Sequence, residues 1–221
     1  MSFWDWFKIP VMPSSPTALT DGVEVSLSDF LEAVQPVDVG VTCGHGLLGV
    51  AENIYRMDEK EGNLLMTHSF LVYASGITPE ICEGTFPKAR RNVGVTVYLG
   101  SNRHTVFFRF NGLNLFQKNG ALTKADDLIQ KPTPYAVGQI VGFLWKVLGR
   151  SVGDESGMTC IEFVTNVLRS QMIRFIPTVA PWLTTPTDAY TWLTAPDGVA
   201  SGWTAVAENV AGKFFIKRSV L

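Results

Sequence analysis

The stretch "SGMTCIEFVTNVLRSQM", residues 156–172, predicts a helix whose first turn holds a cysteine. Thr159 is a favoured N-cap residue and Glu162 follows three positions later, so the pair has the form of a capping box, in which side chains and backbone amides at a helix start satisfy each other. Apolar residues then recur at helical spacing and predict one buried face, made up of Ile161, Val164, Leu168 and Met172. Cys160 therefore falls in the first turn of the predicted helix.

Cys160 admits two interpretations. The unpaired amides and aligned peptide dipoles of a first turn favour negative charge, which lowers the pKa of a thiol and enriches the nucleophilic thiolate. Free cysteines are also among the most buried residue types, and nothing in the local sequence supplies a base. The helix start alone suits a nucleophile, and it suits a small core residue as well.

A base for this thiol would be an imidazole, and the chain offers His45, His68 and His104. His68 opens the apolar segment "THSFLVY", where its ring can project from a sheet edge toward a facing helix start. Glu83, in "ICEGTF", is the polar residue that can fix the tautomer of that ring from the next strand. Because His104 also begins a predicted strand, spacing alone does not select His68.

The rest of the chain predicts a mixed α+β protein. After an aromatic and Pro/Ser-rich lead-in over residues 1–20, helices are expected at 26–34 (starting near Ser28 or Asp29), 45–57, 133–150 and 187–194. Four short segments rich in β-branched and aromatic residues predict an antiparallel meander of about four strands, at 67–75, 80–86, 92–100 and 103–110. The C-terminal segment 202–221 adds one or two strands.

Composition restricts the function classes. A chain of 221 residues with 46% hydrophobic and 17% charged residues is long enough for one substantial core and is not of disordered composition. The net charge of -2, with no basic cluster larger than the run at 88–91, excludes the electrostatic signature of a nucleic-acid-binding protein. The odd number of three cysteines argues against a disulfide framework and fits a reducing compartment. No pattern requires a cofactor, and Cys43-x-His45 offers only two suitable ligands for a metal.

The first residues, "MSFWDWFKIPVMP", lack the basic region and uninterrupted apolar stretch of a secretory signal, and no segment reaches the roughly 20 apolar residues of a membrane span. The sequence therefore predicts a chain that is cytoplasmic as synthesised and reaches the cell envelope only if another machine delivers it. Four aromatic residues near the start are expected first to cover the chain's own core, with a membrane surface or a protein partner as the alternatives: Phe3, Trp4, Trp6 and Phe7.

Over residues 38–194 the order of these parts resembles the permuted NlpC/P60 group of papain-like proteins, which includes YiiX-like bacterial proteins and, more distantly, lecithin:retinol acyltransferase-like enzymes. "MTHSFLVY" (66–73) is similar to the family's histidine strand, and "ICEGTFPKARRNVGVTVYL" (81–99) to its strand carrying a glutamate. "HTVFFRF" (104–110) resembles the strand ending in arginine, and the Thr-Cys-Ile-Glu helix resembles the cysteine helix. "TTPTDAYTWL" (184–193) resembles the trailing Thr-Pro segment, whereas "VDVGVTCGHGLL" lacks the family's Gly-Asp entry.

The resemblance implies a papain-like α+β fold, with an antiparallel sheet of about 4–6 strands packed against helices that include the nucleophile helix. It implies three segments: an extension at 1–37, the permuted domain at 38–194 and a C-terminal extension at 195–221 packed on it. Cys160 would be the nucleophile, His68 the base and Glu83 the orienting group, with Thr159 and Glu162 supporting the helix start and the oxyanion site.

The implied reaction is thioester acyl transfer on an amide, first of all in a peptidoglycan stem peptide, with lipid esters or N-acyl groups as the second substrate class. A catalytically silent binding module with the same fold remains the alternative from another class. In that case Trp182, Trp192 and Trp203 are candidate anchors for a protein partner.

Overall fold

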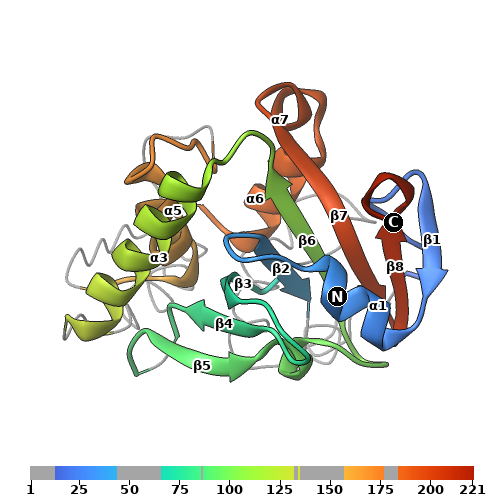
Figure 1. The fold of residues 1–221 in the computed structure, drawn as a ribbon, viewed down its shortest axis with the longest axis horizontal. Coiled ribbons are helices and arrows are strands. Elements are labelled where there is room, and N and C mark those ends of the chain that lie inside the picture. Colours follow the sequence, from blue (N-terminus) through green and yellow to red (C-terminus); the bar gives the residue numbers. More distant parts are fainter. Residues whose placement is uncertain (1–12, 44–65, 86, 132–133, 135–156, 177–183) are drawn as a thin grey trace, which may run out of the picture.

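The computed structural model describes residues 13–43, 66–85, 87–131, 134, 157–176 and 184–221. Within these residues the chain has a mixed α+β architecture, in which eight antiparallel strands form one sheet and five α-helices pack around it. The strands lie side by side in the order β1-β8-β7-β6-β2-β3-β4-β5. Figure 1 shows α3 and α5 together at one end of the molecule and β1, β8 and the C-terminus at the other.

The strands are β1 Gly22–Val25, β2 Val39–Cys43, β3 His68–Ala74, β4 Glu80–Glu83, β5 Arg90–Gly94, β6 His104–Phe110, β7 Trp203–Val210 and β8 Lys213–Lys217. The α-helices are α1 Leu27–Ala33, α3 Leu115–Gln130, α5 Cys160–Arg169, α6 Pro186–Thr194 and α7 Pro196–Ala200. Two short 3-10 helices, η2 Val95–Tyr98 and η4 Arg218–Val220, complete the described secondary structure.

The sheet is wider than the sequence predicted, with eight strands in place of four to six. The expected four-strand meander is also wrong in its last member, because β6 pairs with β2 and not with β5. The reason is that β2, buried along its whole length, lies between β3 and β6 and occupies the centre of the sheet. Local alternation of apolar residues does not reveal such an inserted strand, because pairing depends on segments distant in the chain.

The segment predicted as one strand at 92–100 changes conformation after Gly94. From Val95 the chain forms the 3-10 helix η2, although its residues are β-branched and aromatic. The turn carries Tyr98 back over β3, where its ring stacks on Phe70 with centroids 4.7 Å apart. Packing of this aromatic pair overrides the local β propensity.

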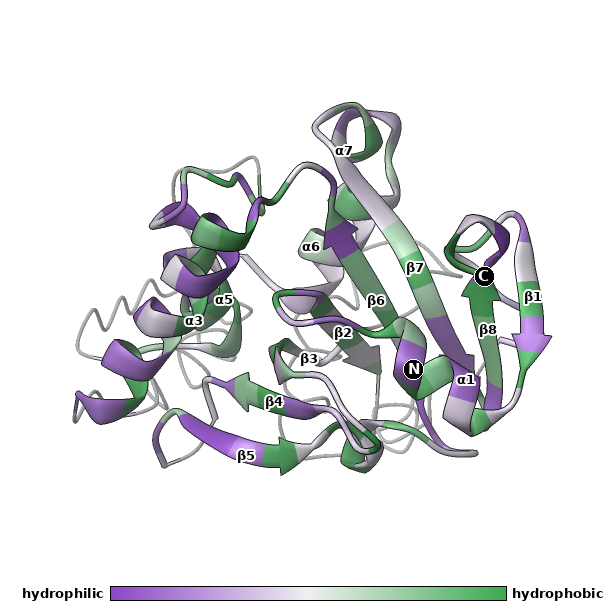
Figure 2. Cartoon of the chain, in the orientation of Figure 1, coloured by the Kyte–Doolittle hydropathy of each residue, from purple (hydrophilic) through white to green (hydrophobic). Residues whose placement is uncertain are grey.

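Two apolar cores lie on the two faces of the sheet, and Figure 2 shows hydrophobic stretches along strands such as β6 and β8. On one face α3, α5 and α6 cover Val39, Val41, Leu71 and Phe108. On the other face α1 contributes Phe30, which packs with Phe70, Phe107 and Ile216. The side chains of β2 and β3 therefore alternate between two covered faces, which explains why these strands read as nearly continuous apolar runs.

The helices differ from the predicted ones in several ways. The first begins at Leu27, one residue before Ser28, which confirms the predicted start, and its N-cap is Ser26. Helices α3 and α7 and strand β1 were not predicted; in α3 the fully buried residues are the small Ala121 and Ala125, which give little periodic signal. The helix expected at 45–57, and that at 133–150 apart from Pro134, fall outside the described residues.

Helix α5 confirms most of its predicted buried face, with Ile161, Val164 and Leu168 in the core. Met172 is the exception, since its side chain is 96% exposed. The helix ends at Arg169, and the following turn holds Met172 at φ 61°, so the helical spacing no longer applies there.

The sheet joins all parts of the described chain. Strand β1 pairs with β8, and β7 pairs with β6, so the segments assigned to 1–37, 38–194 and 195–221 contribute to one sheet. No helix among the described residues has the length and apolar character needed to cross a membrane.

Candidate active site

The start of α5 forms as predicted and fixes the position of Cys160. Thr159 is the N-cap: its Oγ1 accepts the N–H of Glu162 at 3.2 Å, while Glu162 Oε2 accepts the N–H of Thr159 at 2.7 Å. This capping box occupies the side chains of both supporting residues. It makes Cys160 the first residue of the helix, where the backbone dipoles favour a negative charge.

His68 and Glu83 meet because the two strands that carry them run antiparallel. His68 is the first residue of β3, and Glu83 is the last residue of β4, so the ends of the two strands lie together. The imidazole Nε2 faces the Glu83 carboxylate Oε2 at 2.6 Å. The Glu83 side chain is fully buried and that of His68 is 13% exposed.

A glycine allows α5 to approach these strands, against which it packs. A Cβ placed on Gly84 would lie 2.9 Å from the carbonyl oxygen of Thr159 and 2.9 Å from Cβ of Phe163. Only a residue without a side chain leaves room for the helix start at this distance. The backbone next to Glu83 thus brings the thiol within reach of the histidine strand.

The thiol of Cys160 lies close enough to the His68 ring for the two groups to shift each other's pKa. Since Nε2 of His68 faces Glu83, the ring nitrogen left for the thiol is Nδ1. Burial by itself raises the pKa of Cys160, but the neighbouring His68 and its positive charge, with the backbone of Ser69, lower it below its ordinary value. Among the described residues, the buried Ser69 Oγ has no hydrogen-bond partner.

The pKa of the His68 imidazole shifts in the opposite direction. Burial lowers the pKa of His68, but the neighbouring Cys160 and the hydrogen-bonded Glu83, together with their negative charges, outweigh it and raise the pKa to about 10. A lowered thiol pKa and a raised imidazole pKa favour a thiolate–imidazolium pair at neutral pH. The structure therefore brings together Cys160, His68 and Glu83, the three residues to which the sequence assigned catalytic roles.

Two further residues hold the carboxylate, and sequence reasoning missed both. Arg90 donates to Glu83 Oε1 from Nε and Nη2, each at 2.7 Å, and the Tyr98 hydroxyl donates to Oε2 at 2.6 Å. Burial raises the pKa of Glu83, yet His68, Tyr98 and Arg90 together lower it to about 2. The carboxylate is thus ionised across the neutral range.

The signal for these residues in the sequence was weak. Arg90 belongs to the short basic run at 88–91, whose ordinary interpretation is a solvated turn, and its side chain is 52% exposed. Tyr98 lies in a segment predicted as a regular strand. Only the 3-10 turn directs its hydroxyl toward Glu83.

The cysteine itself is well shielded, with 4% of its surface exposed. An enzyme, unlike a binding module, needs the Cys160 sulfur to lie within reach of the His68 imidazole and to be open to solvent. The first condition holds, whereas the second does not hold in this conformation.

Comparisons with known proteins show a distant likeness to solved structures. No family model matches the sequence, and no curated protein matches it. Among solved structures, the chain is similar to the metalloprotein yiiX from Escherichia coli O157:H7, of the DUF1105 group. The two chains are 11% identical, the alignment covers 84% of this chain and 90% of that chain, and the TM-score is 0.44.

The other histidines and cysteines have different surroundings. His104 Nε2 faces Glu208 Oε1 at 2.6 Å, and both side chains are fully buried. Cys43 and Cys82 are buried, and burial raises the pKa of Cys82 above its ordinary value. His45, the second residue of the considered Cys43-x-His45 metal site, is outside the described residues, within which no cluster of three or more metal-ligating side chains occurs.

The aromatic residues considered as anchors divide into two groups. Phe3, Trp4, Trp6, Phe7 and Trp182 lie outside the described residues. Trp203 is fully buried, and its Nε1 donates to the carbonyl of Arg174 at 2.9 Å, so it is a core residue and not an exposed anchor. Trp192 is half-buried and packs against the same core.

Proposed function

We propose that this chain is a cysteine hydrolase that acts by thioester acyl transfer. The observation that supports the proposal most strongly is the contact of three chemically matched side chains from distant parts of the chain, Cys160, His68 and Glu83. A buried thiol without a function gains nothing from an imidazole whose second nitrogen is held by an ionised carboxylate. This is the arrangement expected of an activated nucleophile, its base and an orienting group.

In the proposed reaction the Cys160 thiolate attacks the carbonyl carbon of an amide, and a C–S bond forms as the carbonyl oxygen becomes an oxyanion. The oxyanion collapses, the C–N bond breaks, and the His68 imidazolium transfers its proton to the departing amine. Water then attacks the thioester, neutral His68 takes its proton, and the carboxylic acid leaves as the thiolate re-forms.

The helix start supports the negative charges of this cycle. The capping box engages the N–H groups of Thr159 and Glu162, so the N–H of Cys160 is the donor that the proposal assigns to the oxyanion. Thr159 and Glu162 act in this proposal by fixing the helix start, since their own polar atoms bind each other.

We place the chain in the permuted NlpC/P60 group of papain-like proteins, on the order histidine strand, glutamate strand, cysteine helix along the sequence. An amide bond in a peptidoglycan stem peptide is the first proposed substrate, with lipid esters or N-acyl groups as the second class. A protein made in the cytoplasm would need a delivery machine to meet the first substrate, whereas the second is available at any membrane.

The alternative function is a silent binding module with the same fold. It is favoured by one observation, the 4% exposure of Cys160. A substrate carbonyl reaches the sulfur only if the chain around it moves, whereas a module has no such requirement. The two functions therefore differ in whether the thiolate reacts with a small reagent.

The test is the rate of iodoacetamide alkylation as a function of pH, with mass spectrometry to locate the label on Cys43, Cys82 and Cys160. In the wild-type protein, Cys160 is expected to react fastest near neutral pH, and His68→Ala is expected to slow it and to shift its rate toward alkaline pH. The other two cysteines are internal controls, because both are buried. Labelling of Cys160 no faster than that of Cys82 in the folded protein would favour the binding module.

The substrate class requires a second assay. Purified wild type and Cys160→Ser are incubated in parallel with muramyl stem peptides and with N-acyl and ester lipids, and the products are identified by mass spectrometry. Release of an amine from the peptide by the wild type alone supports the first substrate class, and release of a fatty acid supports the second. No product from either, despite fast alkylation of Cys160, would reject both substrates but not the activated thiol.

A further inference from the structure

Three large apolar side chains are exposed at one corner of the molecule, where the turn after α5 meets the start of α3. The exposed fractions are 74% for Leu115, 83% for Phe116 and 96% for Met172. Scattered exposed apolar residues are ordinary in soluble proteins, but a cluster indicates an interaction site.

The helix face that carries Phe116 meets the turn that carries Met172, although 56 positions separate the two residues in the sequence. A Cβ placed on Gly120 would lie 2.6 Å from the side chain of Gln171, so α3 touches the turn next to Met172. Phe116 lies four residues before Gly120, on the same helix face and one turn closer to the helix start. Figure 2 shows hydrophobic residues in this turn at the edge of the molecule, beside α3.

Met172 occupies an unfavourable backbone conformation as well as an exposed position. Its φ of 61° is in the left-handed region, at the end of a helix where glycine or asparagine is favoured. A long side chain at this position costs stability, and exposure of its apolar surface brings no compensating burial. A site outside the folded chain for the flexible methionine side chain accounts for its exposure.

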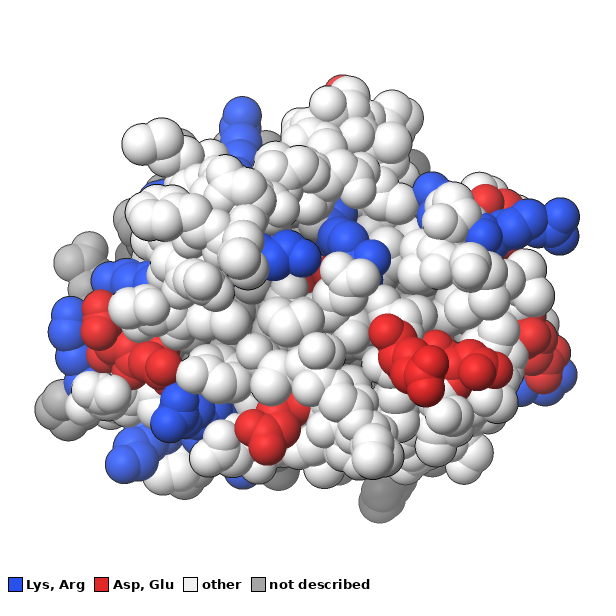
Figure 3. Space-filling model, viewed as in Figure 1, with Lys and Arg blue, Asp and Glu red and all other residues white. Residues whose placement is uncertain are grey.

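The chemistry around the corner is basic. Residues 111–125 and 163–176 contain Lys118, Lys124, Arg169 and Arg174 and no aspartate or glutamate, although the whole chain has a net charge of -2. Lys118 is directed toward Gln35, with Nζ 3.5 Å from its Oε1, so the two arginines are the cations nearest the turn. Figure 3 shows a mostly uncharged surface at the upper left, with one basic side chain projecting at the top and no acidic one.

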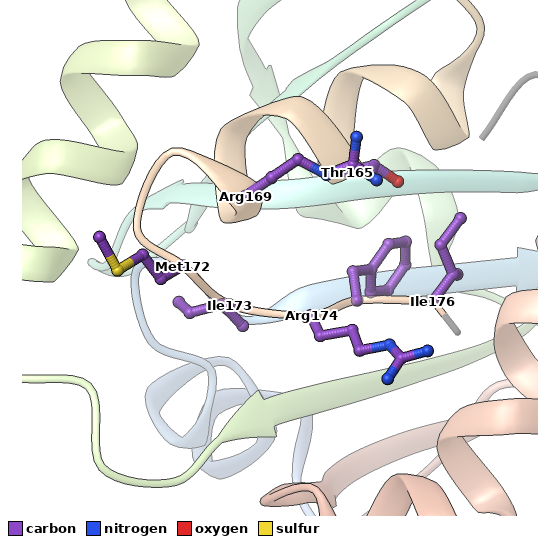
Figure 4. Close-up of a pocket in the computed structure, with 7 residues that line it drawn as sticks. Thr165, Arg169, Met172, Ile173, Arg174 and Ile176 are labelled. Atoms are coloured by element: carbon purple, nitrogen blue, oxygen red, sulfur yellow. The ribbon is translucent and has the colours of Figure 1, made fainter. Parts of the chain in front are cut away.

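The arginines line a pocket of about 160 Å³ next to Met172. Figure 4 shows Arg169 extending from α5 and Arg174 from the following segment, with Met172 at the turn between them. The pocket is also lined by the apolar Phe175 and Ile176 and by Thr165, whose buried hydroxyl has no partner among the described residues. Such a pocket suits a small anionic group joined to an apolar one.

We propose that this corner, defined by Leu115, Phe116, Met172, Arg169 and Arg174, docks the protein on an anionic membrane surface. The apolar side chains enter the boundary between headgroups and acyl chains, and the guanidinium groups contact lipid phosphates. Apolar insertion combined with attraction to anionic lipid is the usual physics of peripheral binding. The surface is distinct from the aromatic residues at 3–7, and the proposal does not depend on the reactivity of Cys160.

The experiment measures flotation of the full-length protein with vesicles of phosphatidylcholine alone and of phosphatidylcholine mixed with phosphatidylglycerol. We expect binding to the mixed vesicles that weakens at high salt. The double variant Phe116→Ser/Met172→Ser should bind at least about tenfold more weakly because it loses two inserted side chains. Arg169→Gln/Arg174→Gln should lose about fivefold per arginine and most of the salt dependence.

The matched control is Ile77→Ser, because Ile77 is also 96% exposed but lies in the turn between β3 and β4. It should bind as the wild type does, and circular dichroism confirms that each variant is folded. Absence of wild-type binding to the mixed vesicles overturns the proposal. A protein would then be the remaining candidate partner of this corner. Binding that both double variants retain in full also overturns the proposal, because another surface then holds the membrane.

Discussion

The Tyr98 hydroxyl donates to the Glu83 carboxylate at 2.6 Å, and the Tyr98 ring stacks on the His68 imidazole with centroids 5.3 Å apart. One side chain therefore restrains both the candidate base and the carboxylate that orients it. Arg90 holds the second carboxylate oxygen, so Glu83 is fixed on three sides. The position and charge of His68 depend on this arrangement as much as on Glu83 itself.

We expect Tyr98→Phe to keep the ring stack and to lose the hydrogen bond. The pKa of Glu83 then rises, because the Tyr98 donor is one of the groups that lower it. A less restrained carboxylate supports the imidazolium less well, and alkylation of Cys160 at about pH 6 should slow by about threefold to tenfold. Tyr73→Phe is the control, since the Tyr73 hydroxyl binds Asp126, at 2.9 Å. Unchanged alkylation in folded Tyr98→Phe would show that the hydroxyl has no positioning role.

Glu83 should make the stability of the protein depend on acid pH. Its pKa is about 2 in the folded chain against an ordinary 4.5, so its contribution to the free energy of unfolding is present above pH 4.5 and is lost as the pH falls toward 2. The shift corresponds to about 3 kcal/mol for this fully buried group. Glu83→Gln removes the titration, so urea unfolding should show the largest difference from wild type at pH 5–7 and a narrowing difference below pH 4.5. A difference that stays constant from pH 6 to pH 3 would contradict the lowered pKa.

Gly84→Ala tests whether the close approach of α5 to β4 sets the position of the thiol. The added methyl group would meet the Thr159 carbonyl and Phe163, both at 2.9 Å, and displace the helix start. We expect a loss of about 1–3 kcal/mol in the free energy of unfolding and slower alkylation of Cys160 at neutral pH. The control is Gly94→Ala, where the new methyl group meets a Thr78 methyl at 3.2 Å and no backbone atom within 4 Å. Alkylation as fast as wild type in folded Gly84→Ala would mean that the helix start tolerates the shift.

The second buried histidine–carboxylate pair should affect stability and not reactivity. Glu208 accepts the backbone N–H groups of Thr17, Ala18 and Leu19 at 2.7, 3.0 and 3.1 Å, in addition to His104. In Glu208→Gln the side-chain amide N–H₂ faces these backbone N–H groups, so donors face donors. We therefore expect a loss of about 3–5 kcal/mol in the free energy of unfolding.

Alkylation of Cys160 in folded Glu208→Gln should follow the wild-type pH profile. The control for loss of one negative charge is Glu24→Gln, at the exposed position of β1, which should leave stability unchanged within about 0.5 kcal/mol. A change in the Cys160 profile of Glu208→Gln would reveal coupling between the two histidine sites.

The sequence determined the parts of this protein that arise from neighbours in the chain. The capping box at Thr159 and Glu162, the helical periodicity of α5 as far as Arg169, and the strands that begin at His68 and His104 follow from interactions within a few residues. Such interactions can be predicted from the order of the residues, because the partners are close together in the chain. The same local patterns brought Cys160, His68 and Glu83 forward as candidates, with the help of the family resemblance.

Tertiary structure decided which of these parts meet. Strand pairing placed the start of β3 beside the end of β4, and the absence of a side chain at Gly84 brought α5 against them. It inserted β2 between β3 and β6, and it bent the predicted strand at 92–100 so that Tyr98 reached Glu83. These contacts join residues far apart in the chain, and their free energy depends on packing and pairing that no local window contains. The sequence therefore proposed the reactive groups, and the fold set their charges and their exposure.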